Sequence, residues 1–405
     1  MILEKNYRSS IKILTTQGYI QYKRYVLNPS DKESKEKLHE LGRKSVVPLD
    51  EYLGLDAIPF KITPMMAVKL AKECIMAGSY AEVEARLLQD QNIKISDDTL
   101  RMVTDYVGEL VHKEHCRNAR ALLSTYDTSK LKMLKKVGRP KKNPFILYME
   151  TDGAMYLARE EGDIQKGWHE HKLGMVFTSK SLKEHTNDKG EIVYTIGDRE
   201  YISNIDGVEA HRNNLLALAI KNGLYEADLM IIITDGAEWI HSTEKNIFPY
   251  AIPILDFFHL MENVRKFAEF DMGASNPETK PWVDKVCKLL EEGKWKEVLD
   301  LPELKKYADG KAKVPKGVVN LYTYIENNKD RIDYPTYRKL GYFYGSGAIE
   351  SGNKNVGHKR IKQSGMRWLP SKAQGVLVLR CKLLSGLWEE EVVSVVNKNY
   401  KLTKV

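Results

Sequence analysis

Residues 228–236 have the sequence Asp228-Leu-Met-Ile-Ile-Ile-Thr-Asp-Gly236, a continuous apolar run that closes with an aspartate and a glycine. Such a run, rich in β-branched residues, is typical of a strand that is buried on both faces of a sheet. Residues 251–255 form a second short apolar segment, and segments with helical spacing lie at 213–222 and 260–270. This alternation predicts a mixed α/β core.

Further strands are expected upstream of this run. Residues 145–150 are mostly apolar and lead into Thr151-Asp-Gly153. Because Asp-Gly is a common turn dipeptide, residues 154–158 are predicted to form the return strand of a hairpin. Residues 171–178 and 192–196 are two more strand candidates.

Three carboxylates are candidate metal ligands and catalytic residues. Asp152 and Asp235 each follow an apolar strand, and an aspartate at the carboxyl end of a strand projects into the cleft beyond the sheet. Glu350 is the only carboxylate from Arg338 to Lys382, a stretch that carries ten Lys or Arg residues. Basic side chains gather polyanions, so a lone carboxylate among them indicates a ligand for a cation directed at a phosphodiester.

Hard cations prefer oxygen ligands, so these carboxylates predict a site for two Mg²⁺ or Mn²⁺ ions. The alternatives are that Asp152 and Asp235 are turn residues, and that Glu238 or Glu262 replaces Glu350. No zinc is expected, because none of the four cysteines forms a CxxC or a Cys/His pair at zinc spacing. The lack of a Walker loop or a GxSxG motif argues against nucleotide hydrolysis and covalent hydrolase chemistry.

The net charge of +8 is modest, but the basic residues are concentrated in blocks. Residues 130–142 carry seven Lys or Arg and no acid, and the prolines and glycine of 138–144 exclude a continuous helix. This segment is predicted to be an extended linker, either solvated or in contact with nucleic acid. Candidate nucleic-acid contacts in this linker and around Glu350 are Arg139, Lys141, Lys142, His358, Lys359, Arg360, Lys362, Arg367 and Trp368. Trp368 is alternatively a core residue.

The N-terminal third of the chain is expected to be largely helical. Residues 1–60 are the hardest part to interpret, with a hairpin predicted around Thr16-Gln-Gly18 and a charged helix at 31–43. Residues 61–128 predict three short helices with tight turns, at 65–76, 80–89 and 97–112. This pattern resembles a helix-turn-helix DNA reader, and a helical bundle or dimerisation module is the alternative.

A chain of 405 residues is expected to form two or three domains. It contains no run of 18 or more apolar residues, and Met1-Ile-Leu-Glu-Lys5 lacks the apolar core of a signal peptide. No membrane association is therefore expected, and the predicted location is the cytoplasm.

Ordered motifs along residues 144–387 resemble those of bacterial insertion-sequence DDE transposases. The closest resemblance is to the Mutator-like group that includes the ISKra and ISLre types. The motifs are Thr151-Asp-Gly-Ala154, Thr234-Asp-Gly-Ala-Glu-Trp-Ile240, Asp256-Phe-Phe-His-Leu-Met-Glu-Asn-Val264, Gly345-Ser-Gly-Ala-Ile-Glu-Ser351 and Arg360-Ile-Lys-Gln-Ser-Gly-Met-Arg-Trp368. Many relatives carry a cysteine-rich N-terminal region, which this chain lacks.

The resemblance implies an RNase H-like catalytic domain that acts on double-stranded DNA, both transposon terminal repeats and target. Its first part would be 145–270 and its last part 338–405, separated by a helical insertion at 271–337 and preceded by the helical DNA-binding region and the basic linker at 129–144. The catalytic and metal-binding triad falls on Asp152, Asp235 and Glu350, with Asp256 and His259 as supporting residues.

The resemblance also implies a homodimer or higher oligomer on DNA and a location at the bacterial nucleoid. Two alternatives use the same residues differently. One is an RNase H-like nuclease or resolvase without strand transfer, and the other is a domesticated DNA-binding protein without catalysis.

Overall fold

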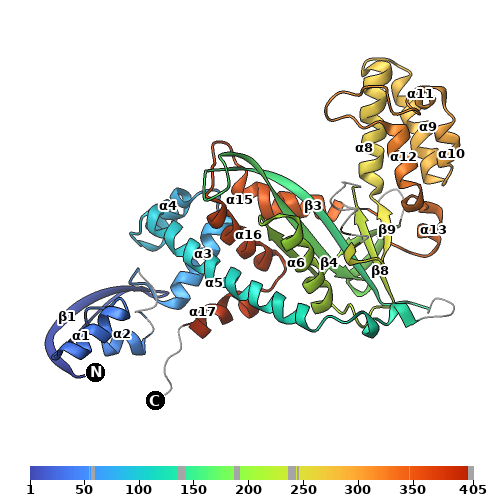
Figure 1. Cartoon of the computed structure of the whole chain (residues 1–405). Coiled ribbons are helices and arrows are strands. Elements are labelled where there is room, and N and C mark those ends of the chain that lie inside the picture. The colour runs from blue at the N-terminus through green and yellow to red at the C-terminus, as the bar shows by residue number, and fades with distance from the viewer. Residues whose placement is uncertain are drawn as a thin grey trace. The chain divides into compact units, whose positions relative to one another are not determined.

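The computed structural model (Figure 1) describes residues 1–53, 55, 60–135, 142–186, 192–235, 243, 246–345 and 347–399. The chain forms two compact units, and neither is continuous in sequence. The first comprises Met1–Asn118, Tyr156–His169 and Val356–Val405, and the second comprises Ala119–Met155 and Glu170–Asn355. None of the helices in the described part of the chain is long and apolar enough to span a membrane.

A mixed five-stranded sheet runs through the second unit. In spatial order its strands are β7 (Arg199–Asn204), β4 (Gly167–Thr178), β3 (Ile146–Ala158), β8 (Leu229–Thr234) and β9 (Ile252–Leu255). β4 and β7 are antiparallel, whereas β8 is parallel to both β3 and β9. The predicted mixed α/β core is therefore confirmed.

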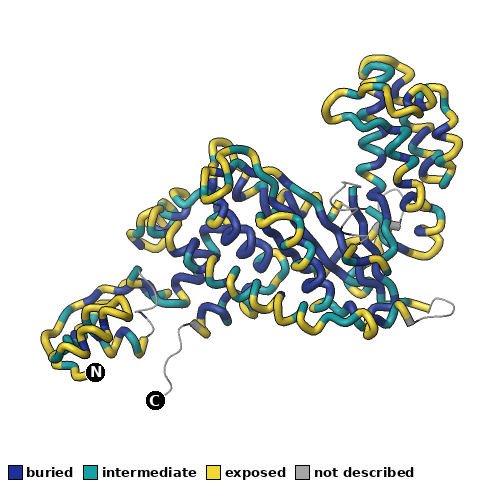
Figure 2. The backbone as a smooth tube through the Cα atoms, viewed as in Figure 1, coloured by how far each residue is buried: buried dark blue, intermediate teal, exposed yellow. Residues whose placement is uncertain are grey.

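The central strands are buried on both faces, as the β8 sequence predicts. Met230, Ile231, Ile232 and Ile233 are each at most 2% exposed, and Figure 2 shows these strands as the darkest part of the second unit. On one face, alternate residues of β3 and β8 pack against the helix α6 (Gly207–Lys221). Residues with the opposite parity on β3 therefore point to the other face of the sheet.

Strand β3 corrects the predicted turn at Asp152-Gly153. The strand continues without a break through both residues, and its neighbour β4 begins only at Gly167. A Cβ at Gly153 would lie 2.1 Å from Oε1 of Glu170. The Glu170 side chain therefore lies directly against the Gly153 backbone, and Asp152 lies within β3 instead of at its end.

Helices complete the second unit, and they make up much of 279–339. They follow the strands as α8 (Phe257–Ala268), α9 (Thr279–Glu291), α10 (Trp295–Leu299), α11 (Pro302–Lys305), α12 (Leu321–Asn328), α13 (Tyr334–Lys339) and α14 (Gly347–Asn353). A separate two-stranded ribbon joins β5 (Leu182–Thr186) to β6 (Ile192–Ile196).

The first unit confirms the predicted hairpin and the predicted helices. The hairpin is β1 (Leu3–Thr15) with β2 (Gly18–Pro29), and α1 (Lys32–Glu40) and α2 (Pro48–Tyr52) follow. The three-helix region consists of α3 (Pro64–Met76), α4 (Tyr80–Gln91) and α5 (Asp97–Ser124). α5 is longer than predicted, because no glycine or proline ends it between residues 112 and 124. The C-terminal part adds α15 (Lys359–Ile361), α16 (Pro370–Leu384) and α17 (Ser394–Asn399).

Helices α5 and α16 approach closely through two glycines. A Cβ at Gly108 would lie 2.8 Å from the Cα of Gly375, whereas a Cβ at Gly375 would lie 3.3 Å from the Cα of Gly108. Backbone atoms cannot move aside as a flexible side chain can. An added methyl group is therefore expected to be tolerated less well at Gly108 than at Gly375.

We expect Gly108→Ala to lower the free energy of unfolding by about 1–3 kcal/mol, because the added methyl group overpacks the helix crossing. Gly375→Ala, with the longer approach distance, should cost less. Urea denaturation of both variants measures the difference. A stabilised Gly108→Ala variant, as helix propensity alone predicts, would contradict the close crossing.

Candidate active site

Two aspartates lie at the same edge of the sheet because the parallel strands β8 and β9 end there. Asp235 directly follows β8, and Asp256 directly follows β9. The backbone N–H of Asp256 donates to the carbonyl of Thr234, 2.9 Å away, which fixes the two strand ends together. The predicted position of Asp235 at the end of a strand is confirmed.

Asp256 is fully buried and caps the N-terminus of α8. Its carboxylate accepts hydrogen bonds from the backbone N–H groups of Phe258 (3.0 Å) and His259 (3.3 Å). The same carboxylate accepts a 2.5 Å hydrogen bond from Nδ1 of the His259 ring. This contact raises the pKa of His259 to about 9, with Asp235 and Glu350 adding to the effect, so the imidazole is protonated at neutral pH.

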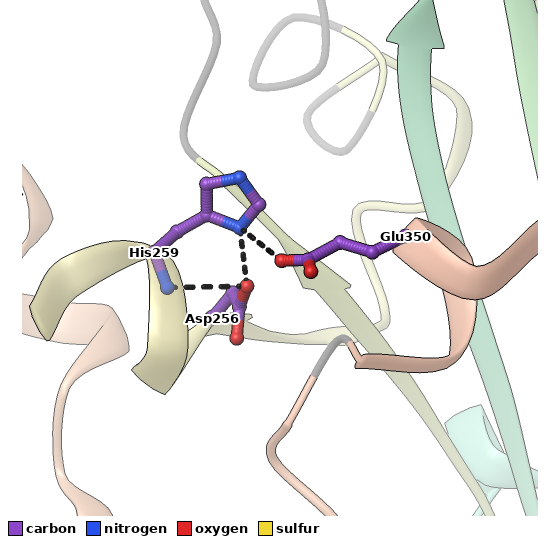
Figure 3. Close-up of side chains that lie close together, drawn as sticks. All are labelled: Asp256, His259 and Glu350. Carbon is purple, nitrogen blue, oxygen red and sulfur yellow. Dashed lines mark hydrogen bonds and ion pairs between the residues drawn. The ribbon is translucent and has the colours of Figure 1, made fainter. Parts of the chain in front are cut away.

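Glu350 lies on α14 and faces the same histidine. Its Oε1 is 3.6 Å from Nδ1 of His259, and its side chain is 52% exposed. Figure 3 shows the Asp256 and Glu350 carboxylates on one side of the ring, while the second ring nitrogen points away from both. One potential ligand atom from each of Asp256, His259 and Glu350 lies within 4.8 Å of the others, so these residues could hold a metal ion once the imidazole loses its proton.

Asp152 lies on the face of β3 opposite α6 and belongs to the same electrostatic group. Burial, and after it the nearby charge of Asp235, raises the pKa of Asp152 to about 6. Its carboxylate accepts hydrogen bonds from the N–H of Gly153 (2.7 Å) and from Nδ2 of Asn353 (2.6 Å). Burial thus makes the charged form of Asp152 less favourable, and the charge of Asp235 adds to this effect.

These features fit a divalent cation. Two carboxylates that repel each other and a third partly exposed one provide the oxygen ligands that Mg²⁺ and Mn²⁺ prefer. A bound cation would remove the repulsion that raises the pKa of Asp152. The structure thus brings the predicted triad residues Asp152, Asp235 and Glu350 into one electrostatic group through His259, which interacts with all three.

Sequence reasoning missed two side chains of this site. Glu150 is fully buried and its Oε2 accepts a 3.0 Å hydrogen bond from the backbone N–H of Ile349, the residue before Glu350. Burial raises the pKa of Glu150 well above its ordinary value. Asn353 lies one helical turn after Glu350 and holds Asp152. Spacing alone indicates only that Glu150 shares a strand face with Asp152 and that Asn353 shares a helix face with Glu350.

The helical segment after α11 fixes the carboxyl edge of the sheet. The Tyr324 hydroxyl of α12 donates to the backbone carbonyl of Asp235 (2.7 Å), and the Tyr334 hydroxyl of α13 donates to that of Leu255 (2.9 Å). The buried Arg331 donates to the Thr234 hydroxyl. These contacts join residues about 80 to 100 positions apart, so no local pattern indicates them.

An aromatic groove of about 850 Å³ borders the site in the second unit. Phe257 and Phe258 line it from the start of α8, Ser351 from α14, and Arg199 and Arg338 add positive charge. Phe258 is 59% exposed, which is unusual for a phenylalanine. Aromatic rings can stack on the bases of a single nucleic-acid strand, and guanidinium groups can bind its phosphates.

The predicted nucleic-acid contacts separate into exposed and buried residues. Lys142, Lys359, Lys362 and Arg367 are exposed, and His358 is partly exposed. Arg360 and Trp368 are buried in the first unit, so they do not form part of an open basic surface. Arg139, Lys141 and Glu238 lie outside the described residues. All four cysteines are free thiols, with Cys74 and Cys381 buried and Cys116 and Cys287 partly buried.

Comparison with known proteins gives one distant relative and no family. No family model matches the chain. The chain is 22% identical over 370 residues to the UPF0236 protein in vanSb 3'region from Streptococcus gallolyticus, an alignment that covers 88% of this chain and 71% of the relative. That name states no activity.

The His259–Asp256 contact predicts a pH-dependent stability. Because the folded pKa of about 9 lies above the ordinary 6.5, the contribution is complete below pH 6.5 and is lost as pH rises through 9. We expect His259→Gln to cost on the order of 2–3 kcal/mol at pH 6 in metal-free buffer and much less at pH 9.5. Denaturant unfolding of both proteins across this range measures the difference. A cost that does not change with pH would contradict a protonated imidazole.

Glu150 predicts a contrast between two substitutions. Glu150→Ala should lower the free energy of unfolding by about 2–4 kcal/mol, because it leaves a cavity and a buried Ile349 N–H without an acceptor. Glu150→Gln keeps an oxygen that can accept this hydrogen bond and should cost about 1 kcal/mol or less. Urea denaturation distinguishes the two, and an equal loss would show that the Glu150 contact to Ile349 does not stabilise α14.

Proposed function

We propose that this protein is a DNA transposase of the DDE type, which hydrolyses a phosphodiester at a transposon end and joins the freed 3′-OH to target DNA. The observation that supports this most is the group of three carboxylates, Asp152, Asp235 and Glu350, gathered around the protonated His259. The strand order and mixed pairing of the sheet are compatible with an RNase H-like catalytic core.

Asp152, Asp235 and Glu350 would hold divalent cations, with Asp256 and His259 next to them. Bound Mg²⁺ or Mn²⁺ would activate the attacking oxygen and offset the charge that develops on the leaving oxygen. The protein's own contribution is to hold the carboxylates in place before DNA binds. Asn353 fixes Asp152, and the Asp256–His259 pair faces Glu350.

The same site can perform both steps without another cofactor. In the first step water attacks the phosphorus, the bond from phosphorus to the 3′ oxygen breaks, and the strand ends in a 3′-OH. In the second step this 3′-OH attacks a phosphodiester of the target, and a target 3′ oxygen leaves. His259 carries a positive charge that would attract the phosphate, since its second ring nitrogen points away from both carboxylates.

The helical region of α3, α4 and α5 and the exposed Lys359, Lys362 and Arg367 would bind DNA phosphates. Synapsis of two transposon ends would require at least a dimer. Two alternatives remain. An RNase H-like nuclease would use the same carboxylates for hydrolysis without joining, and a domesticated DNA-binding protein would catalyse neither step.

The proposal is tested with purified protein, Mg²⁺ and a labelled duplex that spans the sequence flanking the gene. We expect nicking and joining by the wild type, and a loss of at least about a hundredfold in both for Asp235→Asn and Glu350→Gln, because each removes a charged ligand. The matched control is Glu262→Gln, an α8 carboxylate that pairs with Lys266 at 2.9 Å, and it should retain activity.

Nicking without joining would favour the nuclease alternative, and binding without nicking would favour the domesticated protein. Full activity in Glu350→Gln together with a loss in Glu262→Gln would overturn the triad.

A further inference from the structure

The β1–β2 hairpin of the first unit has two faces of different character. On its inner face Ile11, Ile13 and Val26 are buried, and β2 contacts both α1 and α2. Because successive side chains of a strand point to opposite faces, the residues between these positions lie on the outer face. The outer face carries Lys5, Arg8, Ser10, Lys12, Tyr19, Gln21, Lys23 and Tyr25, all of them exposed except the partly buried Tyr25.

The outer face has positive charge without compensation. Its cations are Lys5, Arg8, Lys12 and Lys23. Glu4 is the only acid in residues 3–29, and its pairing with Asn28 places it on the inner face. None of the four cations forms an ion pair with a carboxylate in the part of the chain that the structure describes. A solvated face usually alternates the two signs of charge, and this one does not.

The inner face of the same hairpin shows the opposite arrangement. Its cation Arg24 forms an ion pair with the carboxylate of Asp50. On the outer face, Lys5 and Arg8 both contact the neutral Tyr25 instead, and their hydrogen bonds lower the pKa of its hydroxyl. Cations whose neighbour is neutral keep their charge available for a polyanion.

The four cations form one row along the hairpin. In the strand register, Lys5, Arg8, Lys23 and Lys12 occupy successive positions of the outer face. Neighbouring cations are therefore about 7 Å apart along the strands, and the row spans about 20 Å. One strand of duplex DNA carries a phosphate for roughly every 3.4 Å of axis, so the row can follow a DNA backbone over about six base pairs. The major groove, about 12 Å wide, admits a two-stranded β-ribbon.

We propose that the outer face of the β1–β2 hairpin binds the phosphate backbone of duplex DNA. Contacts to phosphates carry no sequence information, so the hairpin would hold any duplex and its affinity would fall steeply with salt. In a transposase it would hold transposon or target DNA away from the carboxylate site. That use of the surface rests on the proposed function, whereas binding to duplex DNA as such does not.

A single nucleic-acid strand fits the outer face less well than a duplex. Nζ of Lys12 lies 4.2 Å from the centroid of the Tyr19 ring, and Nζ of Lys5 lies 3.7 Å from that of Tyr25. A base would have to displace these cations before it could stack there.

An anionic membrane also fits the outer face less well. Membrane-surface elements insert large apolar side chains. The exposed apolar side chain of Ile20 lies opposite Ile13 and therefore belongs to the inner face.

The test compares the full-length wild type with a Lys12→Gln/Lys23→Gln variant, whose fold is checked by circular dichroism. Both lysines are exposed. Binding to labelled duplexes of unrelated sequence is measured by fluorescence anisotropy in EDTA over a range of salt concentrations. We expect the variant to bind every duplex about tenfold or more weakly at about 0.1 M salt. The slope of log K against log salt should fall by about 2, because each lysine neutralises one phosphate.

The matched control is Lys32→Gln/Lys37→Gln on α1. This variant loses the same charge from the same unit, but its two lysines already pair with Glu36 and Glu33. Its affinity and its salt slope should be those of the wild type.

An unchanged slope in the Lys12→Gln/Lys23→Gln variant, or an equal loss in the control, would overturn the proposal. A loss of affinity only for a single strand, or only for phosphatidylserine vesicles, would overturn it in favour of that ligand. Because EDTA removes divalent cations, these results do not depend on the carboxylate site. Duplex binding that depends on the two lysines, without nicking in Mg²⁺, would support the hairpin surface and contradict the proposed function.

Discussion

The geometry of the site depends most on the hydrogen bonds of the buried Asp256 carboxylate. A fully buried aspartate is stable only when its charge is met by hydrogen bonds, and here the N-terminus of α8 and the His259 ring supply them. The contact also makes the imidazole positive and directs it at Glu350. A single residue at the end of β9 therefore sets the direction of a helix, the protonation of a histidine and the surroundings of a carboxylate on a distant helix.

The sequence predicts those parts of the site that depend on local chemistry. The apolar run of β8 identifies a strand buried on both faces and places Asp235 at its end. The predicted position of Asp152 at the end of a strand is wrong, because the Asp-Gly dipeptide is a turn signal only where the flanking residues do not continue a strand. Whether they do depends on β4 and β8, which pair with β3 from elsewhere in the chain.

The parts that sequence could not predict all depend on contacts over long separations. Glu150 contacts Ile349 across 199 positions, and Asn353 contacts Asp152 across 201. The helix of residues 347–353 is short, and its orientation depends on these hydrogen bonds instead of on propensity. For the same reason Arg360 looked like a surface phosphate contact in a basic stretch, although the fold buries it between two aromatic rings.

Two groups of charged side chains in the described part of the chain are unbalanced in opposite ways. Around Asp152 the excess is of negative charge, and burial together with the charge of Asp235 raises the pKa of Asp152. On the outer face of the β1–β2 hairpin the excess is of positive charge, because four exposed cations have no carboxylate beside them on that face. Both arrangements lower the free energy of unfolding, and a ligand that binds only the native state raises it.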